Sequence, residues 1–547
     1  MMPFFSISLR KLIIVVLACL LGLYLVSFSD YFNNGQSGSW VDSIDHGELP
    51  QKSAAEADDK LAVGPTASDY YNATTNYQRR QAVREATKHA WAAYKKFAWG
   101  KDEYRPLTKG SNLRWGDWAI TLVDSLDTLK LVGLETEYKE AKQFVGTMRF
   151  DRTSRGYKTQ FFEMTIRALG GLLGAYELDN DPMLLKQAKQ VGDSLAYAFK
   201  TKTGLPTTRV DINRKSPVPT DAICIAEAGT LQLEFKKLSQ LTGDDKYAKL
   251  VENVSDILEA AEKKHKGLYP LYINIQTGKY DQTSSYTIGG KADSFYEYLL
   301  KQYILHDGKE PKFKERYVTS VEAIKDKLLK KSSSGFSYIG ELASNEKDFV
   351  HQMSHLACFY PGLLALGSKA LDRPQDLELA KELARTCYYT YRMTPTGLGP
   401  ERFVFKSEKN QKLRNMLTWW LTKWFAPVYE FDANGIGSAN TQYYLRPETI
   451  ETMFILYRVT GDTKYQEWGW NMFKAIEKYT KLEFGYAGIK DVYSTSTLFN
   501  RLNSMESFFL AETLKYLYLL FSPTDLLPLN EYVLNTEAHP LRIMKSK

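Results

Sequence analysis

The chain has 547 residues, of which 44% are hydrophobic and 13% aromatic. It exceeds the roughly 250 to 300 residues at which one ordinary core stops growing, so it contains either several domains or one closed repeat. Its formal charge of +7 is small for this length, and Lys and Arg are dispersed along the chain, which argues against nucleic-acid binding.

The N-terminal region is typical of a membrane anchor. Residues 12–28 form an uninterrupted apolar run preceded by Arg10 and Lys11. A helix of this length reaches about 25 Å, just under the hydrocarbon thickness of a bilayer. Because no small-residue cleavage site follows, an uncleaved signal anchor is favoured over a cleaved signal peptide. The basic flank predicts a cytosolic tail (1–11) and a single-pass type II protein.

Residues 29–78 are polar and lack a sustained hydrophobic period, which predicts a flexible lumenal stem. The remaining residues, 79–547, are predicted to form the folded lumenal domain.

Two kinds of helix alternate along this domain. Seven segments begin with an acidic residue or a His and continue as apolar runs, at Asp124, Glu163, Glu227, Asp293, His355, Glu448 and Glu506. Between them lie seven amphipathic segments with charged faces, at 80–97, 136–150, 182–200, 244–264, 311–331, 373–391 and 463–480. A helix that is apolar all round belongs inside, with an amphipathic partner outside it.

The alternation predicts an all-α fold, an (α/α)7 toroid with short β-hairpins at one end. The strand-like pieces lie in the connections, at 205–212, 268–275, 335–342 and 401–405. A carboxylate at the start of a single helix is explained by the helix dipole. Seven comparable starts indicate instead that carboxylates gather at one end of a shared core.

The chain has four cysteines. Cys19 lies in the predicted anchor, and Cys224 lies in an apolar stretch where we expect a buried free thiol. An oxidising lumen makes a disulfide between Cys358 and Cys387 plausible.

Several long motifs, in order, resemble those of the class I α-1,2-mannosidases, glycoside hydrolase family 47: FFEMTIRALGGLLGAY, GGKADSFYEYLLKQY, HLACFYPGLLALG, LRPETIETMFILYRVTGD and LNTEAHPL. The resemblance extends from about Trp91 to Leu541. It implies an inverting exo-α-1,2-mannosidase that trims high-mannose N-glycans of glycoproteins in the endoplasmic reticulum or Golgi. We expect a membrane-anchored monomer with a lumenal catalytic domain.

An alternative on the same barrel is a mannose-binding quality-control lectin without turnover. The set of Glu163, Asp293, Glu448 and Thr536 argues against it, because a pure binder has no need of a base that activates water.

Glycoside hydrolysis requires a carboxylic acid to protonate the leaving oxygen and a carboxylate to activate water or attack the sugar. Glu163, Asp293 and Glu448 are the candidates. The resemblance implies that Glu448 is the base. It favours Glu163 as the acid, with Asp293 as the rival.

The resemblance also implies a set of substrate-binding residues: Arg167, Glu227, Lys291, His355, Glu401, Glu451 and Glu506. Two of them have equally simple structural explanations, since Arg167 could form an ion pair and His355 a buried hydrogen bond. Lys291 stands where members of the endoplasmic-reticulum type carry Arg, so the preferred glycan branch stays open.

The metal expected is Ca²⁺, because the sequence has no His/Cys spacing for zinc and an oxygen-rich pocket suits a hard cation. The resemblance implies that Thr536 binds Ca²⁺ through its backbone carbonyl and hydroxyl, while Glu451, Glu506 and Glu537 orient the bound waters.

Overall fold

The computed structural model describes residues 73–154, 156–406 and 431–545, which belong to one compact unit. The predicted tail, the anchor and the stem up to residue 72 lie outside the described residues. Among the helices of the described ranges, none combines the length and apolar character needed to cross a bilayer.

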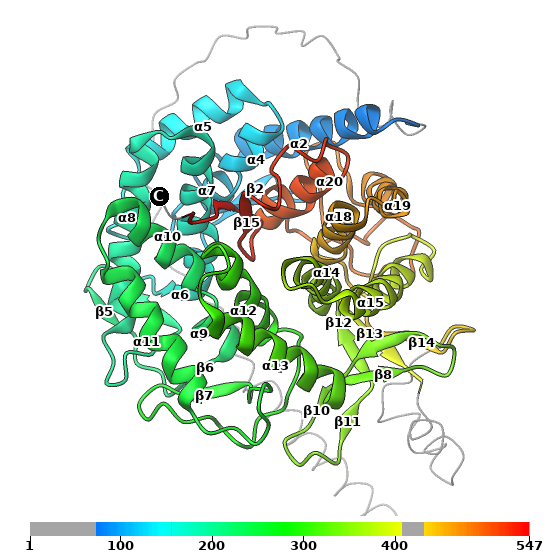
Figure 1. Ribbon diagram of the computed structural model, residues 1–547. Helices are drawn as coiled ribbons and strands as arrows, with labels where there is room; N and C mark the ends of the chain where they lie inside the picture. The colour runs from blue at the N-terminus through cyan, green and yellow to red at the C-terminus, as the bar shows by residue number, and fades with distance from the viewer. Residues whose placement is uncertain (1–72, 155, 407–430, 546–547) are drawn as a thin grey trace, which may run out of the picture. The chain divides into compact units, whose positions relative to one another are not determined.

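Within the described ranges, seven amphipathic helices form an outer layer, which Figure 1 shows around the inner helices. They are α2 (Asn76–Ala98), α5 (Glu135–Thr147), α8 (Pro182–Leu195), α11 (Lys246–Ala260), α13 (Pro311–Lys327), α15 (Pro374–Arg392) and α19 (Lys464–Thr480). Local signals set their starts. Thr75 and Gln78 form a capping box before α2, and Asp181 caps α8 ahead of Pro182.

Seven apolar segments form the inner layer, several of them broken by a π or 3-10 turn. They are α3 (Ile120–Asp124) with α4 (Leu126–Leu131); α6 (Phe161–Glu163), η2 (Met164–Leu169) and α7 (Gly170–Asp179); α9 (Ile225–Gly229) with α10 (Gln232–Thr242); α12 (Asp293–Leu305); η4 (His355–Phe359) with α14 (Tyr360–Ala370); α18 (Glu448–Thr460); and η5 (Phe509–Thr513) with α20 (Leu514–Leu520). A short 3-10 turn, η3 (Ala196–Phe199), extends the outer helix α8.

The inner segments close into a ring. Contacts run from α4 to α7, α10, α12, α14, α18 and α20, and η5 returns to contact α3 and α4. Each outer helix packs against inner helices, as α15 does on α14 and α13 on α12. The predicted (α/α)7 arrangement of the domain is therefore confirmed.

Large aromatic side chains fill the space between the layers, among them the buried Trp91, Tyr94 and Tyr317. Each fully buried large apolar side chain contributes about 1.5–3 kcal/mol. The inner helices also approach closely, because a Cβ on Gly171 of α7 would lie 2.7 Å from the carbonyl oxygen of Val123 in α3. The first two inner segments, and with them Asp124 and Glu163, are thereby held close together.

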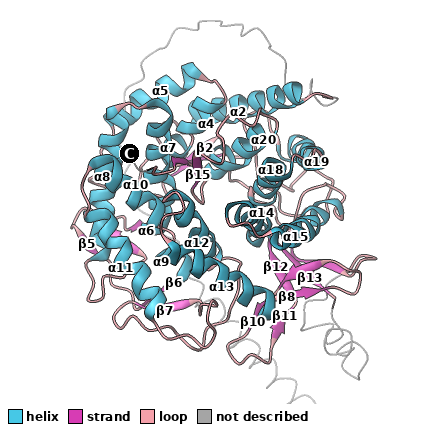
Figure 2. Ribbon diagram, in the orientation of Figure 1, coloured by secondary structure: helices cyan, strands magenta, loops and turns pink. Residues whose placement is uncertain are grey.

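Short antiparallel strands lie in the connections (Figure 2). The two-stranded pairs are β1 (Glu103–Arg105) with β2 (Gly110–Asn112), β6 (Ala222–Cys224) with β7 (Tyr272–Asn274), β8 (Leu329–Lys331) with β9 (Ser337–Ile339), β10 (Glu341–Leu342) with β11 (Phe349–Val350), and β15 (Tyr532–Leu534) with β16 (Pro540–Arg542). The three-stranded sheets are β3 (Thr159–Gln160), β4 (Arg209–Asp211) and β5 (Ser216–Pro217), and β12 (Gln352–Ser354), β13 (Arg402–Phe405) and β14 (Ile436–Asn440).

The β15–β16 hairpin has a special place, because it enters the ring from the C-terminal end of the inner helices. Just after β16, the backbone of Met544 donates to Leu305 at the end of α12, whereas the turn of the hairpin reaches the hydroxyl of Tyr298 inside the ring. Figure 1 shows β15 between α7 and α12. The hairpin carries Thr536 toward the opposite end of the ring.

Candidate active site

A cavity of about 300 Å³ opens where the inner segments begin. Its carboxylates come from α6, α9, α12, α18, η5 and the C-terminal hairpin turn: Glu163, Glu227, Asp293, Glu297, Glu448, Glu451, Glu512 and Glu537. Three cationic side chains also line it, Arg167, Lys291 and Arg446. Eight carboxylates against three cations leave a formal excess of 8 − 3 = 5 negative charges. The predicted gathering of carboxylates is confirmed.

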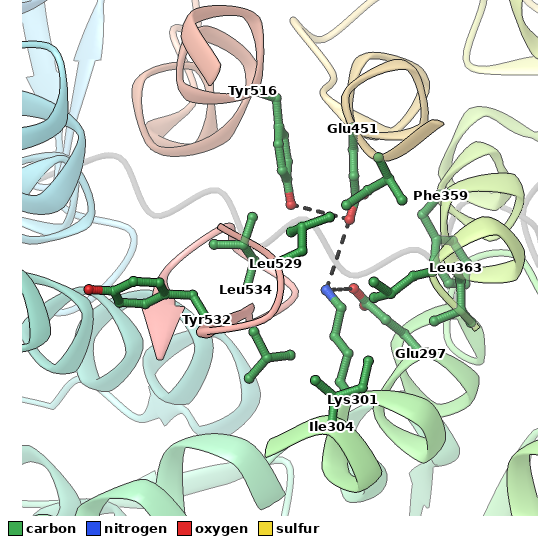
Figure 3. Close-up of a pocket in the computed structure, with 14 residues that line it drawn as sticks. Glu297, Lys301, Ile304, Phe359, Leu363, Glu451, Tyr516, Leu529, Tyr532 and Leu534 are labelled. Carbon is green, nitrogen blue, oxygen red and sulfur yellow. Dashed lines mark hydrogen bonds and ion pairs between the residues drawn. The ribbon is translucent and has the colours of Figure 1, made fainter. Parts of the chain in front are cut away.

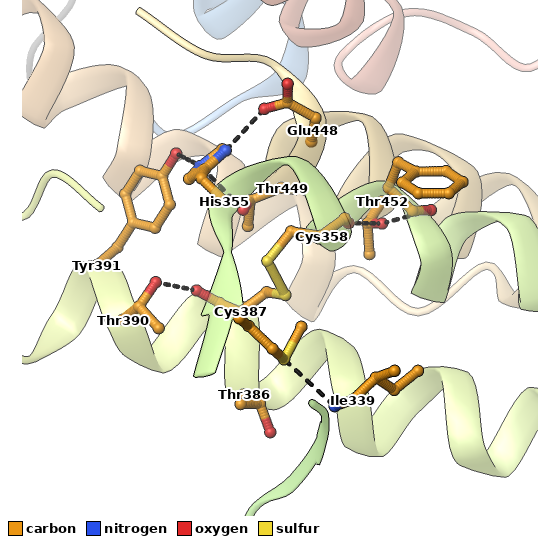
Figure 4. Close-up of a disulfide and its surroundings, with 12 residues drawn as sticks. Ile339, His355, Cys358, Thr386, Cys387, Thr390, Tyr391, Glu448, Thr449 and Thr452 are labelled. Atoms are coloured by element: carbon orange, nitrogen blue, oxygen red, sulfur yellow. Dashed lines mark hydrogen bonds and ion pairs between the residues drawn. A yellow bond between two sulfur atoms is a disulfide. The ribbon is translucent and has the colours of Figure 1, made fainter. Parts of the chain in front are cut away.

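Glu448, the predicted base, is held by a buried histidine. Nδ1 of His355 lies 2.6 Å from Oε2 of Glu448, and Nε2 of His355 lies 2.7 Å from the Tyr391 hydroxyl (Figure 4). Burial by itself would raise the pKa of Glu448, but the His355 hydrogen bond and the Arg446 charge hold that pKa below its ordinary value. Glu448 is therefore ionised at neutral pH, as a base must be.

The pKa of Asp293 is shifted in the opposite direction from that of Glu448. It lines the same cavity from the first residue of α12. Burial raises the pKa of Asp293 to about 7, and the negative charges of Glu297 and Glu448 act in the same direction. A substantial fraction of Asp293 thus retains its proton near neutral pH.

Arg167 makes the ion pairs that the sequence left as one of two possibilities. Its Nε lies 2.8 Å from Oε2 of Glu163, one turn earlier, and its Nη1 contacts Glu537 and lies 3.6 Å from Asp124. Because Arg167 also lines the cavity, it both fixes Glu163 and faces the space where a ligand would lie.

Lys291 and Glu227 form one wall with the free, buried thiol of Cys224. The Lys291 ammonium donates to the Tyr272 hydroxyl at 2.6 Å, and its backbone has φ +76°. Such a φ is strained for a residue with a Cβ and marks functional positions disproportionately. Burial and the Glu163 charge raise the pKa of Glu227.

Three predicted residues lie behind the cavity wall and outside its lining. His355 is buried behind Glu448. Both oxygens of Glu401 accept from Nε of Arg446 at 3.0 Å, so Glu401 acts on the cavity through that arginine. Glu506 pairs with Arg114 at 3.3 Å and accepts from Ser504 at 2.5 Å.

Three charged lining residues were missed from the sequence: Glu297, Arg446 and Glu512. Glu297 lies one turn after Asp293, and Glu512 is the acidic residue within the apolar run FFLAETLKYLYLLF. The sequence did contain a signal for the two carboxylates, because both lie inside helices that are otherwise largely apolar. Burying such a group costs free energy unless a partner compensates its charge.

Thr536 lies at the floor, on a turn built by Asn535. The Asn535 amide donates to Oε1 of Glu234 at 2.8 Å, and its Oδ1 accepts from the backbone of Glu537 and His539 at 2.9 and 2.8 Å. Thr536 lines the cavity together with Glu451, Glu512 and Glu537.

The donors at this floor fit a hard cation. In the described ranges no three or more His, Cys, Asp or Glu side chains converge as a ready metal cluster, so the fit is judged from Thr536 and its surroundings. Burial and mutual repulsion raise the pKa of Glu451 to about 8 and that of Glu512 well above its ordinary value. Excess buried negative charge surrounding oxygen donors is what Ca²⁺ compensates.

Comparison with known proteins decides the family. Residues 86–543 match the model described as glycosyl hydrolase family 47. The chain belongs to this family.

Relatives of this family member are similar over most of their length. It is 41% identical over 479 residues, 85% of this chain and 79% of the relative, to the mannosyl-oligosaccharide 1,2-alpha-mannosidase MNS1 of Arabidopsis thaliana. It is 39% identical over 503 residues, 91% of this chain and 68% of the relative, to the endoplasmic reticulum mannosyl-oligosaccharide 1,2-alpha-mannosidase of Homo sapiens. The solved alpha-1,2-mannosidase from Trichoderma reesei superposes with a TM-score of 0.78 at 29% identity, covering 86% of this chain and all of that one.

The predicted disulfide is confirmed in this family 47 hydrolase. Cys358 of η4 is bonded to Cys387 of α15, with Cα atoms 5.9 Å apart (Figure 4). Because His355 is in the same short segment as Cys358, the bridge ties the element behind Glu448 to the outer layer.

Proposed function

We propose that this hydrolase is an inverting exo-α-1,2-mannosidase that removes terminal α-1,2-linked mannose from high-mannose N-glycans of glycoproteins. The observation that carries the proposal is the electrostatic division of one cavity, in which the pKa of Glu448 is lowered and that of Asp293 is raised to about 7. Carboxyl groups whose surroundings push their pKa values apart mark the base and the acid of a glycosidase. The names of the relatives support the same substrate.

In this mechanism Glu448 accepts a proton from the attacking water. His355 holds the Glu448 carboxylate in position through the contact between its Nδ1 and Oε2 of Glu448. Asp293 gives its proton to the leaving oxygen. Glu163, which the resemblance favoured as the acid, is fixed instead by Arg167 and takes second place in this proposal. Mannosyl fluoride, whose leaving group needs little protonation, separates the two: the variant of the true acid retains far more activity on the fluoride than on the glycan.

We further propose Ca²⁺ as the cofactor, held by the hydroxyl and backbone carbonyl of Thr536, with Glu451, Glu506 and Glu537 orienting its waters. The bound ion supplies a fixed positive charge for adjacent sugar hydroxyls. Glu506 lies outside the cavity lining, whereas Glu512 lines it and is the better placed of the two. Exhaustive chelation should abolish turnover and lower the melting temperature, and Ca²⁺ but not Zn²⁺ should restore both.

The cellular setting is proposed from the sequence alone. A type II anchor at 12–28 would place the catalytic domain in the lumen of the endoplasmic reticulum or Golgi, where N-glycans are trimmed. We propose that the domain acts there as a monomer.

The test is digestion of a nine-mannose glycan by the purified lumenal domain, followed by proton NMR. Inversion releases β-mannose first, which then equilibrates with the α-anomer. Initial release of α-mannose would refute inversion, and absence of release from a folded, Ca²⁺-saturated domain would refute the hydrolase proposal and favour the lectin.

A further inference from the structure

Three buried lysines hold the C-terminal hairpin inside the ring. Each comes from a different inner helix and donates to a backbone carbonyl of the hairpin region: Lys237 to Arg542 at 2.8 Å, Lys301 to Asn535 at 3.3 Å and Lys515 to Ala538 at 2.9 Å. Each also pairs with a buried carboxylate, Glu177, Glu297 and Asp127 respectively. The turn that carries Thr536 is therefore attached to the inner helices by buried ammonium groups.

Lys301 differs from the other two in what else it contacts. Its partner Glu297 lines the catalytic cavity, and so does Glu451, whose Oε1 lies 4.0 Å from the ammonium. Figure 3 shows the Lys301 nitrogen between these two carboxylates, with the Tyr516 hydroxyl 3.2 Å from Glu451 on the other side. The carbonyl that Lys301 binds belongs to Asn535, the residue before Thr536.

This arrangement has a direct physical consequence. Lys301 is only 5% exposed, so its charge is compensated by the protein and little by water. Removing one partner of a buried pair leaves the remaining charges uncompensated and free to move or to take up protons. Loss of the Lys301 ammonium would release Glu297, Glu451 and the Asn535 carbonyl together.

We propose that Lys301 is a positioning residue of the active site. Its ammonium group orients the side chains of Glu297 and Glu451 and fixes the turn that carries Thr536. The inference rests on the proposed function, because the site that it organises is the proposed Ca²⁺ and sugar site. Lys237 and Lys515 hold the same hairpin but pair with carboxylates outside the cavity lining.

The test compares Lys301→Met, Lys301→Arg and Lys237→Met with the unmodified domain. Ca²⁺ affinity is measured by titration calorimetry on protein from which Ca²⁺ has been removed with a chelator, at a temperature well below the melting temperature. Loss of a group that orients metal-site residues typically weakens metal affinity by about 10- to 100-fold, which is the loss expected for Lys301→Met. Lys301→Arg, which keeps the charge, should lose less. Lys237→Met should melt at a lower temperature with unchanged Ca²⁺ affinity.

Equal Ca²⁺ affinity of Lys301→Met and the unmodified domain would overturn the inference, as would equal losses in Lys301→Met and Lys237→Met. If Lys301→Met does not fold, Lys301→Arg decides, because the bulkier guanidinium displaces the charge and should weaken Ca²⁺ binding measurably. An unmodified domain that binds no Ca²⁺ and releases no mannose would refute the proposed function itself, a result distinct from failure of the Lys301 variants.

Discussion

Two clusters of buried charge lie side by side on the inner helices, and they differ in balance. The cavity has eight carboxylates and three cations in its lining. Behind it, Asp124 and Asp127 are met by His539 at 3.0 and 2.8 Å, by Lys515 at 2.8 Å from Asp127, and by Arg167. The first cluster has more carboxylates than cations, whereas both carboxylates of the second cluster are paired with cationic groups of the protein.

The pKa directions follow this difference. Burial opposes ionisation of Asp124 and Asp127, yet their cationic and hydrogen-bonding partners hold both pKa values below the ordinary value. Burial would likewise lower the pKa of His539, but the charge of Asp127 raises it. In the cavity, burial raises the pKa values of Asp293, Glu451 and Glu512, and neighbouring carboxylates raise them further, because too few cationic partners offset these effects. Compensated charge serves stability here, and uncompensated charge is available to a ligand.

The largest expected effect is on chemistry in the cavity. Glu448→Gln should lower kcat by about 10²- to 10⁴-fold, the usual contribution of a positioned base, because an amide cannot accept the proton of water. Its melting temperature should stay near that of the unmodified domain. Near-normal turnover by the folded variant would show that another group is the base.

The second cluster should respond in the opposite way. Asp127→Asn leaves Lys515 buried without its counterion and should lower the free energy of unfolding by about 3–5 kcal/mol, measured by chemical denaturation. The kcat of the folded fraction should change little. Glu140→Gln, at an exposed pair with Lys95, is the matched control and should cost under about 1 kcal/mol. If Asp127→Asn abolished turnover without a stability loss, the division between the clusters would be wrong.

The disulfide contributes to stability without involving either charged cluster. The double variant Cys358→Ser with Cys387→Ser opens a loop with a sequence separation of 29. The expected loss is about 3 to 4 kcal/mol of unfolding free energy, in the chain-entropy account of disulfides. Denaturation of the variant and of the unmodified domain gives the difference directly. A stability equal to that of the unmodified domain would contradict this account.

The smallest effect expected is a shift of the pH profile. Glu448 must be ionised and Asp293 protonated, so kcat/KM at saturating Ca²⁺ should fall above about pH 7 as Asp293 loses its proton. It should also fall at acid pH, below the ordinary Glu range, as Glu448 gains one. His355→Gln removes the imidazole that lowers the pKa of Glu448, so the acid limb should move to higher pH while the alkaline limb stays. Movement of the alkaline limb alone would contradict these assignments.

The fold could be predicted because its cause is local and repeated. A TGDxKY element recurs at 242–247 and 460–465, and in both copies the Gly, at 243 and 461, ends an inner helix with φ +72°. Helices that are apolar on all sides alternate with amphipathic helices. A closed double layer buries the former completely and the apolar faces of the latter. The seven helical pairs and the carboxylates at the inner starts followed from these patterns. The disulfide was predicted on a separate ground, an expected oxidising lumen.

Which carboxylates face the cavity was decided by the tertiary structure. Glu506 begins the predicted inner run but precedes the first helical residue, Ser507, and pairs with Arg114. Glu512, six residues later and within the π-helical η5, lines the cavity. The same holds for Lys301 and Lys515, which in the sequence are single basic residues in apolar runs, and for Lys237, which follows Lys236. Only the ring brings them to one hairpin. Periodicity along the chain determines which face of a helix is buried, but what a buried charge meets depends on residues up to several hundred positions away.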